Sequence, residues 1–253
     1  MSSSPLLVGS DVRHSSHVCL PFETDDEKHN ATVAFIHEGL SRGARCMYLG
    51  TKEDFDMLGR GLEELGICTR RATSRGALLY RTVEEVYLYG GIFDPPRALD
   101  HTDGLIDSAL TDGFAGLRIT AELTRIPAQG EWQKIMWYDA MINERFARRP
   151  VATLCRYPRA MIPALRVRDV LRTHPVAIVR GESCENPFYE RPEIVLNGDA
   201  ETLVDWQFRQ LRVQQRARQH LEASRSSAVA AAAELAAELH HLRSGHEKPT
   251  KPD

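Results

Sequence analysis

Residues 17–50 read HVCLPFETDDEKHNATVAFIHEGLSRGARCMYLG, and this stretch decides the fold. Two short apolar runs, 17–22 and 44–50, flank a longer segment, 25–42, whose apolar residues recur at helical spacing. The apolar face of that segment carries Val33, Phe35, Ile36 and Leu40. Gly43 follows directly and is a suitable residue for ending a helix. The stretch therefore predicts a strand, a helix and a second strand, the unit from which parallel sheets are built.

The same alternation continues to about Gly181, as in proteins that wind helices around a parallel sheet. Further strands are expected at 77–81, 116–122, 151–157 and 175–180, and further helices at 52–66, 95–112, 132–149 and 164–173. We predict an α/β fold with a mostly parallel sheet and helices on both faces. The segment 181–197 contains Pro187 and Pro192 and is expected to be irregular chain that covers the sheet.

The composition narrows the class of protein. The chain has 253 residues, 42% of them hydrophobic and 26% charged, which is typical of a folded globular protein. Lys and Arg total 32 against 35 Asp and Glu, so the net charge of −3 favours no direct binding of nucleic acid. The sequence has no run of about 18 apolar residues, and its start lacks the features of a signal peptide. With an odd number of cysteines as well, the chain is expected to be cytoplasmic and away from the membrane.

The C-terminal region has a different pattern. Residues 198–243 lack proline and have no glycine after Gly198, so they predict one long helix with Asp199 as its N-cap. Small and large apolar residues in this helix follow the spacing of a coiled-coil seam. They are Leu221, Ala228, Ala232, Leu235, Leu239 and Leu242. We expect a homodimer through this helix, with packing of the helix back onto its own domain as the alternative. The expected division is 8–197, 198–243 and a polar tail, 244–253.

The turn after the first strand is where such folds often hold phosphate, because helix N-terminal amides and glycines can surround an anion. Here the turn, 22–30, has no glycine and four carboxylates. Acidic residues favour a well-capped helix start and repel a triphosphate. The turn is therefore interpreted as a helix cap.

A metal centre has one candidate in the sequence. His14, His17 and Cys19 have the spacing His-x-x-His-x-Cys, and His17 and Cys19 would share one face of a strand. A fourth ligand would have to come from elsewhere, and no Cys-x-x-Cys accompanies them. We expect no metal here, and a haem or metal sensor using His17 and Cys19 stays an alternative. The sequence names no cofactor.

Candidate ligand-binding residues lie at the carboxyl edge of the expected sheet, where open α/β sheets place their ligands. Glu122 ends the strand 116–122 and Tyr157 ends the strand 151–157, so the two would be close if these strands are neighbours. Tyr138 lies on the helix between them. The sequence has no nucleophile elbow, no zinc-protease motif and no dinucleotide fingerprint, so we expect no enzyme.

Several phrases between Val8 and Pro192 resemble the MEDS domain, the methanogen and methylotroph sensory domain named for DcmR. They are His17–Phe22, Phe35–Gly43, Cys46–Leu49, Leu117–Glu122, Tyr138–Asn143, Leu154–Tyr157, Arg172–Pro175 and Asn186–Tyr189. That family is similar in turn to RecA-like ATPases of the circadian-clock type, which implies a RecA-like fold. The resemblance places the P-loop lysine on Lys28, its hydroxyl residue on His29 and one catalytic glutamate on Glu53. It implies a vestigial nucleotide site.

The resemblance also implies a function. Family members are regarded as sensors of small, hydrocarbon-like compounds and are joined to kinase, anti-sigma or DNA-binding transcription-factor outputs. We expect a non-catalytic signalling protein that binds a small ligand and regulates such a partner through its C-terminal helix. The expected pocket residues are Phe22, Glu122, Tyr138, Tyr157 and His174.

Other functions stay open. The first is nucleotide binding or residual ATPase activity through Lys28 and Glu53, and the second is the haem or metal sensor. The third is a scaffold whose helix binds an acidic partner through Arg209, Arg212, Arg216 and Arg218. Such a run of arginines is more typical of a solvated helix face.

Overall fold

A computed structural model describes residues 16–122, 124 and 131–244, apart from the side chains at 238 and 240–244. His14, the domain start expected at Val8, the tail 245–253 and the seam side chain of Leu242 lie outside the described part. The described residues divide into two compact units, the first ending at Gly198 and the second beginning at Asp199. Within these residues, no helix is both long and apolar enough to cross a membrane.

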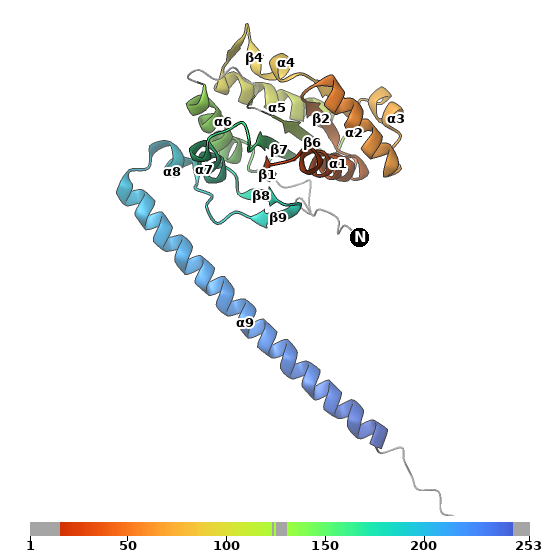
Figure 1. The fold of residues 1–253 in the computed structure, drawn as a ribbon, viewed down its shortest axis with the longest axis vertical. Helices are drawn as coiled ribbons and strands as arrows, with labels where there is room; N and C mark the ends of the chain where they lie inside the picture. Colours follow the sequence, from red (N-terminus) through yellow and green to blue (C-terminus); the bar gives the residue numbers. More distant parts are fainter. Residues whose placement is uncertain (1–15, 123, 125–130, 245–253) are drawn as a thin grey trace, which may run out of the picture. The chain divides into compact units, whose positions relative to one another are not determined.

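The first unit is built on a seven-stranded sheet (Figure 1). Its strands, in spatial order, are β3 (Leu78–Arg81), β2 (Arg45–Leu49), β6 (Leu117–Ala121), β7 (Val151–Pro158), β1 (Ser16–Phe22), β8 (Val176–Val179) and β9 (Glu182–Glu185). All neighbours are parallel except β8 and β9. A separate short hairpin joins β4 (Leu88–Tyr89) to β5 (Ile92–Phe93). Each strand expected from the sequence is present.

Helices cover both faces of this sheet. The helices of the first unit are α1 (Asp25–Ser41), α2 (Lys52–Glu64), α3 (Thr69–Ser74), α4 (Val83–Tyr87), α5 (Pro95–Thr111), α6 (Trp132–Arg145), α7 (Ala164–Thr173) and α8 (Pro192–Asn197). Apolar residues of α1 and α2 share one core with one face of the sheet, and those of α5 and α6 form another core on the opposite face. The predicted α/β class is confirmed: a mostly parallel sheet with helices on both faces, followed by a long helix.

The side chains of each strand alternate between these two faces. In β1, Val18 and Leu20 pack with α1, whereas Cys19 belongs to a third core that includes residues of α7. In β7, Leu154 faces the α1 side and Cys155 faces the α7 side. Consecutive residues of one buried strand therefore face opposite sides of the sheet and belong to different cores.

The expectation of irregular chain over 181–197 is wrong. Val179 ends β8 and Glu182 starts β9, with a two-residue turn between them in which Arg180 has φ 51° and Gly181 φ 81°. Two positive φ values give the tight hairpin turn whose twist matches paired strands. The chain then continues into α8.

The segment between β9 and α8 is tied to α7 by polar contacts. The side-chain amide of Asn186 donates to the carbonyls of Leu171 and His174 at 2.6 and 2.7 Å. Arg172 donates two hydrogen bonds to the carboxylate of Glu190, at 2.9 and 2.7 Å. These contacts explain why a proline-containing segment is ordered.

Most helix ends follow the expected signals. Gly43, Gly66 and Gly113 follow α1, α2 and α5 with φ between 76° and 84°. The helix expected at 132–149 ends earlier, at Arg145, because Phe146 turns into the core as the C-cap and Pro150 follows.

The second unit contains α9 (Ala200–Ser244), a single helix of 45 residues. The Asp199 carboxylate accepts from the backbone amide of Thr202 at 2.8 Å, which confirms the predicted cap. Most of its larger apolar side chains are exposed to solvent, among them Leu221, Leu235 and Leu239, whereas Trp206 is buried.

Candidate functional site

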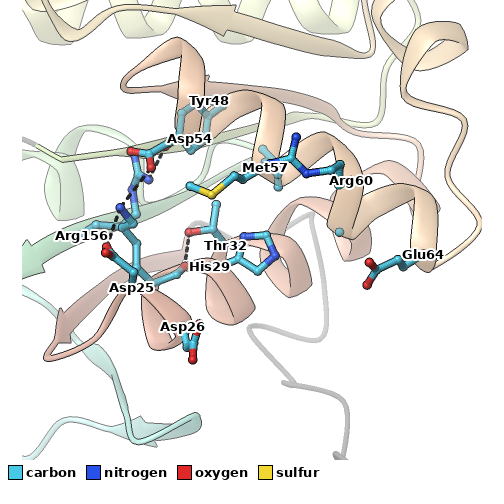
Figure 2. A pocket seen from close by; sticks show the side chains of 13 residues that line it. Asp25, Asp26, His29, Thr32, Tyr48, Asp54, Met57, Arg60, Glu64 and Arg156 are labelled. Atoms are coloured by element: carbon cyan, nitrogen blue, oxygen red, sulfur yellow. Dashed lines mark hydrogen bonds and ion pairs between the residues drawn. The ribbon is translucent and has the colours of Figure 1, made fainter.

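A pocket of about 290 Å³ lies at the carboxyl ends of β1, β2 and β7. From β1 the chain passes through α1 to β2, toward one edge of the sheet. From β7 it passes through α7 to β8, toward the opposite edge. Such a reversal is the place where open α/β sheets bind ligands. Figure 2 shows Asp25, Asp54 and Arg156 gathered at one end of this pocket, with Met57, Arg60 and Glu64 following along α2.

The start of α1 is a capped helix start. The Thr24 hydroxyl accepts from the Glu27 amide at 3.2 Å, and the Glu27 carboxylate accepts from the Thr24 and Glu23 amides. This reciprocal arrangement is a capping box, which occupies amides that a phosphate would need. The interpretation of the acidic turn as a cap is confirmed.

Lys28 is held by two carboxylates. Its ammonium lies 3.1 Å from Asp25 and 3.2 Å from Asp54, and its side chain is only 13% exposed. Burial alone would lower the pKa of Lys28, but the hydrogen bonds and charges of Asp25 and Asp54 raise it above its ordinary value. Burial alone would raise the pKa of Asp54, but Lys28 holds it below its ordinary value. This lysine of the pocket is therefore already neutralised.

Arg156 supplies a second, deeper cation. Its side chain is 1% exposed, donates to the Tyr48 hydroxyl at 2.8 Å and to the Leu49 carbonyl at 2.6 Å, and stacks on the Tyr48 ring. Both acceptors are neutral. A guanidinium fixed in this way presents a rigid polar surface at the end of the pocket.

The other wall is apolar and closely packed. Met57 and Leu58 of α2 line it together with the Tyr48 ring. At Gly61, an added Cβ would lie 2.7 Å from the Val33 side chain of α1, so α1 and α2 are in close contact at this position. The pocket combines a polar end with an apolar side, and its lining holds four carboxylates against three cations.

A second group of polar side chains is buried on the opposite face of the sheet, between the strands and α6 and α7. His17, Asp139, Cys155 and His174 place one nitrogen, oxygen or sulfur atom each within 4.8 Å of one another. All four are buried. Cys19, expected to accompany His17, is outside this group, and its thiol donates to the Val176 carbonyl at 3.6 Å.

Comparison with models of known protein families shows which family this chain belongs to. The family model described as the methanogen/methylotroph, DcmR sensory domain matches residues 16–175. The chain belongs to the MEDS family. The match covers the first unit from β1 through α7 and includes both the pocket and the buried group. The predicted family is confirmed.

Comparisons with curated proteins and with solved structures were also made. None of the curated proteins compared with this MEDS chain matches it. Among solved structures, a KaiC-like protein from the hyperthermophilic archaeon Pyrococcus horikoshii OT3 is similar, with 12% identity and a TM-score of 0.43. That similarity covers 64% of this chain and 69% of the other.

The residues expected to form a vestigial nucleotide site lie partly together in this MEDS domain. Lys28 and His29 both line the pocket. Glu53 is exposed, and its neighbour Asp54 supplies the carboxylate that reaches Lys28. Arg156 was not foreseen, although an arginine in the buried phrase Leu154–Tyr157 is a signal that could have identified it.

The structure does not bring the expected ligand residues into one pocket, and none of them is among the residues lining the pocket of Figure 2. Phe22 packs on the α1 side of the sheet, whereas Tyr157 and His174 lie on the α7 side with ring centres 5.7 Å apart. The Tyr138 hydroxyl donates to that of Tyr87 at 3.4 Å within a separate aromatic group. Glu122 follows β6, is 7% exposed and accepts from the Thr124 hydroxyl at 3.4 Å.

Proposed function

We propose that this MEDS chain is a non-catalytic sensor that binds a small, uncharged organic molecule in the pocket between α1 and α2. The observation that carries the proposal is the ion-paired state of Lys28. A polyanion would have to separate Lys28 from Asp25 and Asp54 and approach two further carboxylates. An uncharged molecule meets no such barrier.

The lining supports this class of ligand. Arg156 and the Tyr48 hydroxyl offer hydrogen bonds at one end, while Met57 and Leu58 offer apolar contact along the side. Ligand sites usually combine a few placed polar groups with an apolar wall in this way. A short hydrocarbon derivative with one polar group fits this description.

The long helix is the proposed output. Leu221, Leu235 and Leu239 are 70%, 61% and 56% exposed in the single chain. Exposed apolar side chains in a row are typical of an interaction surface. We propose that α9 forms a homodimer in the cytoplasm and that ligand binding shifts the equilibrium between arrangements of this helix. A kinase, an anti-sigma factor or a transcription factor would then respond.

Calorimetric titration tests the pocket. The purified chain is titrated with short-chain alcohols and halogenated alkanes, which are uncharged. Met57→Trp places a large ring in the pocket from a position that is 37% exposed, so it should weaken any binding at least about tenfold by occupying the space. The matched control is Met161→Trp, at a residue 77% exposed and outside the pocket lining, which should bind normally. Equal binding by both variants would show that the pocket is elsewhere.

Nucleotide binding is the second candidate, because Lys28 does lie in a pocket at the end of β1. Titration with magnesium ATP tests it on the same samples. Tight binding by the wild-type chain that Lys28→Ala abolishes would favour the nucleotide site over the uncharged ligand. Absence of heat with ATP, together with binding of an organic compound, supports the proposal.

A further inference from the structure

Four buried side chains from four separate elements meet between the sheet and α6 and α7. His17 comes from the start of β1, Cys155 from β7, Asp139 from α6, and His174 from the residue that caps α7 before β8. Their exposed fractions are 1%, 4%, 0% and 0%. β1 is far in the sequence from α6, β7 and α7, which follow one another, so only the fold brings His17 to the other three side chains. The pocket of Figure 2 uses none of them.

The spacing of the four groups suits a small metal ion. Zinc binds nitrogen, oxygen and sulfur ligands at roughly 2.0–2.3 Å in a tetrahedron, which separates neighbouring ligand atoms by roughly 3.3–3.8 Å. The Cys155 sulfur lies 3.5 Å from the His17 Nε2, and that nitrogen lies 4.0 Å from the Asp139 Oδ1. All four ligand atoms lie within 4.8 Å of one another. Small side-chain rotations would bring them to binding distance.

Hydrogen bonds to the outer nitrogen orient each histidine. The Asn143 amide nitrogen donates to the carbonyls of Thr173 and Asp139, so its oxygen faces His17 and must accept from Nδ1, at 3.2 Å. The His174 Nδ1 lies 2.8 Å from the Val170 carbonyl, which can only accept. Both rings therefore carry their proton on Nδ1 and direct the Nε2 lone pair into the group. Metal-binding histidines are held in this way by outer acceptors.

Two of the inward atoms have no hydrogen-bond partner among the described residues. They are the Asp139 Oδ1 and the His174 Nε2, both in fully buried side chains. The other Asp139 oxygen accepts from the Tyr157 hydroxyl at 2.8 Å. A buried acceptor without a donor is unfavourable, and here two acceptors point into the same space. A bound cation would satisfy both.

The charge of the group agrees with a divalent ion. The four groups are two imidazoles, a thiol and a carboxyl group. A divalent cation bound by one thiolate, one carboxylate and two neutral imidazoles forms a site that is neutral overall, which a buried position requires.

We propose that His17, Asp139, Cys155 and His174 form a four-coordinate structural site for zinc or a similar divalent transition metal. Two imidazoles, a thiolate and a carboxylate are ligands that zinc accepts, and with all four positions filled by protein no position is open for a reaction. On binding, the Cys155 thiol loses its proton to solvent and becomes a thiolate, and any proton on the Asp139 carboxyl group is also released to solvent. The metal joins β1, β7, α6 and α7, so its binding stabilises the fold.

Elemental analysis of the full chain is the first test, after removal of any affinity tag and gel filtration with a weak chelator. We expect about one zinc ion per chain. Asp139→Asn should lose it, since the carboxamide is a poor ligand. That variant can still accept from Tyr157 and can donate to His174, so the metal-free fold should be kept, as circular dichroism would verify.

Cobalt spectroscopy tests the sulfur ligand. The chain is refolded with Co²⁺, which should give the visible bands of a tetrahedral site and a thiolate-to-cobalt band in the near ultraviolet. Cys155→Ser should abolish the thiolate band. The matched control, Cys19→Ser, changes another fully buried thiol on the adjacent strand, paired with Cys155 in register, and should keep the band.

The proposal fails on either of two results. One is a wild-type chain that binds neither zinc nor cobalt even when refolded with the metal. The other is bound metal whose amount and spectrum are unchanged in both Asp139→Asn and Cys155→Ser, which would place the ion elsewhere on the chain. If Cys155→Ser does not fold, metal content of the wild-type and Asp139→Asn proteins decides alone.

Discussion

Lys28 shows how neighbouring charges determine the role of a single residue. The lysine lies near the start of α1, the helix that follows the first strand. Asp25 and Asp54 hold its ammonium, and no glycine opens the turn before it. The side chain therefore acts as a structural cation between α1 and α2.

Lys28→Ala should lower the free energy of unfolding by about 1–3 kcal/mol at pH 7, because Asp54 would be left half-buried without its cation. Urea denaturation measures this difference. Adding Asp54→Asn to the variant should recover part of the loss, since the unpaired charge is then removed. The control is Lys52→Ala, since the exposed Lys52 side chain pairs with Asp56. If Lys28→Ala lowers the free energy of unfolding no more than Lys52→Ala does, the structural role of Lys28 is contradicted.

The same pair predicts a pH dependence. The pKa of Asp54 is lowered in the folded chain, so the pair stabilises fully above the ordinary carboxyl pKa, about 3.9, and this contribution is lost as pH falls through the lowered value. The difference in urea midpoint between wild type and Lys28→Ala should therefore shrink in acid. A difference that grows on acidification would be inconsistent with this ion pair.

At the residue scale, sequence reasoning found what is local and missed what depends on distant contacts. Lys28, the acidic cap and His17 could be identified from their neighbours in the chain. Asp139 and Cys155 could not be assigned to His17, because the side chains meet only through the order of the strands and the position of α6. The expected pocket residues were grouped by sheet edge, but alternation along the strands sends them to different faces.

At the scale of elements, the Glu38–Gly39 phrase explains how α1 lies on the sheet. The buried Arg118 of β6 donates to the Phe35 carbonyl at 2.8 Å and to the Glu38 carboxylate at 3.0 Å. A Cβ at Gly39 would lie 2.5 Å from the Arg118 Cδ and 2.6 Å from the Cys46 sulfur. The helix passes this close to the strands only because residue 39 has no side chain.

Gly39→Ala should therefore destabilise the chain by about 1–3 kcal/mol, because the new methyl group overpacks a site that also holds a buried ion pair. Gly104→Ala is the matched control, since this glycine lies on an exposed position of α5 with no atom within 4 Å of an added Cβ. The control should gain about 0.5–1 kcal/mol from helix propensity. Thermal unfolding of both variants measures the two effects, and equal values would refute the packing argument.

Long, periodic elements were predictable, and short or irregular ones were not. The strands and crossover helices of the sheet carry strong apolar patterns, so they were found close to their observed bounds. The hairpin of β8 and β9 was missed because Arg180–Gly181 is a weak turn signal and β9 consists of exposed residues. The short helices α3, α4 and α8 contain too few residues for a helical period to show.

At the scale of the whole molecule, α9 is the part of the chain without a core of its own. Among its described side chains most are exposed, including large apolar ones. Isolated helices gain little stability from propensity alone and usually depend on packing against another surface. A second copy of the helix is the partner that the seam spacing favours.

Leu221→Arg combined with Leu235→Arg should convert the proposed dimer to a monomer, because two charged side chains would lie in the seam. Arginine has nearly the helix propensity of leucine, so α9 itself should still form. Sedimentation velocity measures the mass. Leu165→Arg, at a residue of α7 that is 67% exposed, is the control and should leave the dimer intact. A wild-type monomer, or a double variant that stays dimeric, would exclude this interface.

Native mass spectrometry of the full chain, purified gently from cells, tests the central claim most directly. The account predicts a bound organic molecule whose mass is lost in Met57→Trp and retained in Met161→Trp, in a chain that carries no nucleotide. A bound adenine nucleotide that disappears in Lys28→Ala would contradict it and restore nucleotide binding as the function of this pocket.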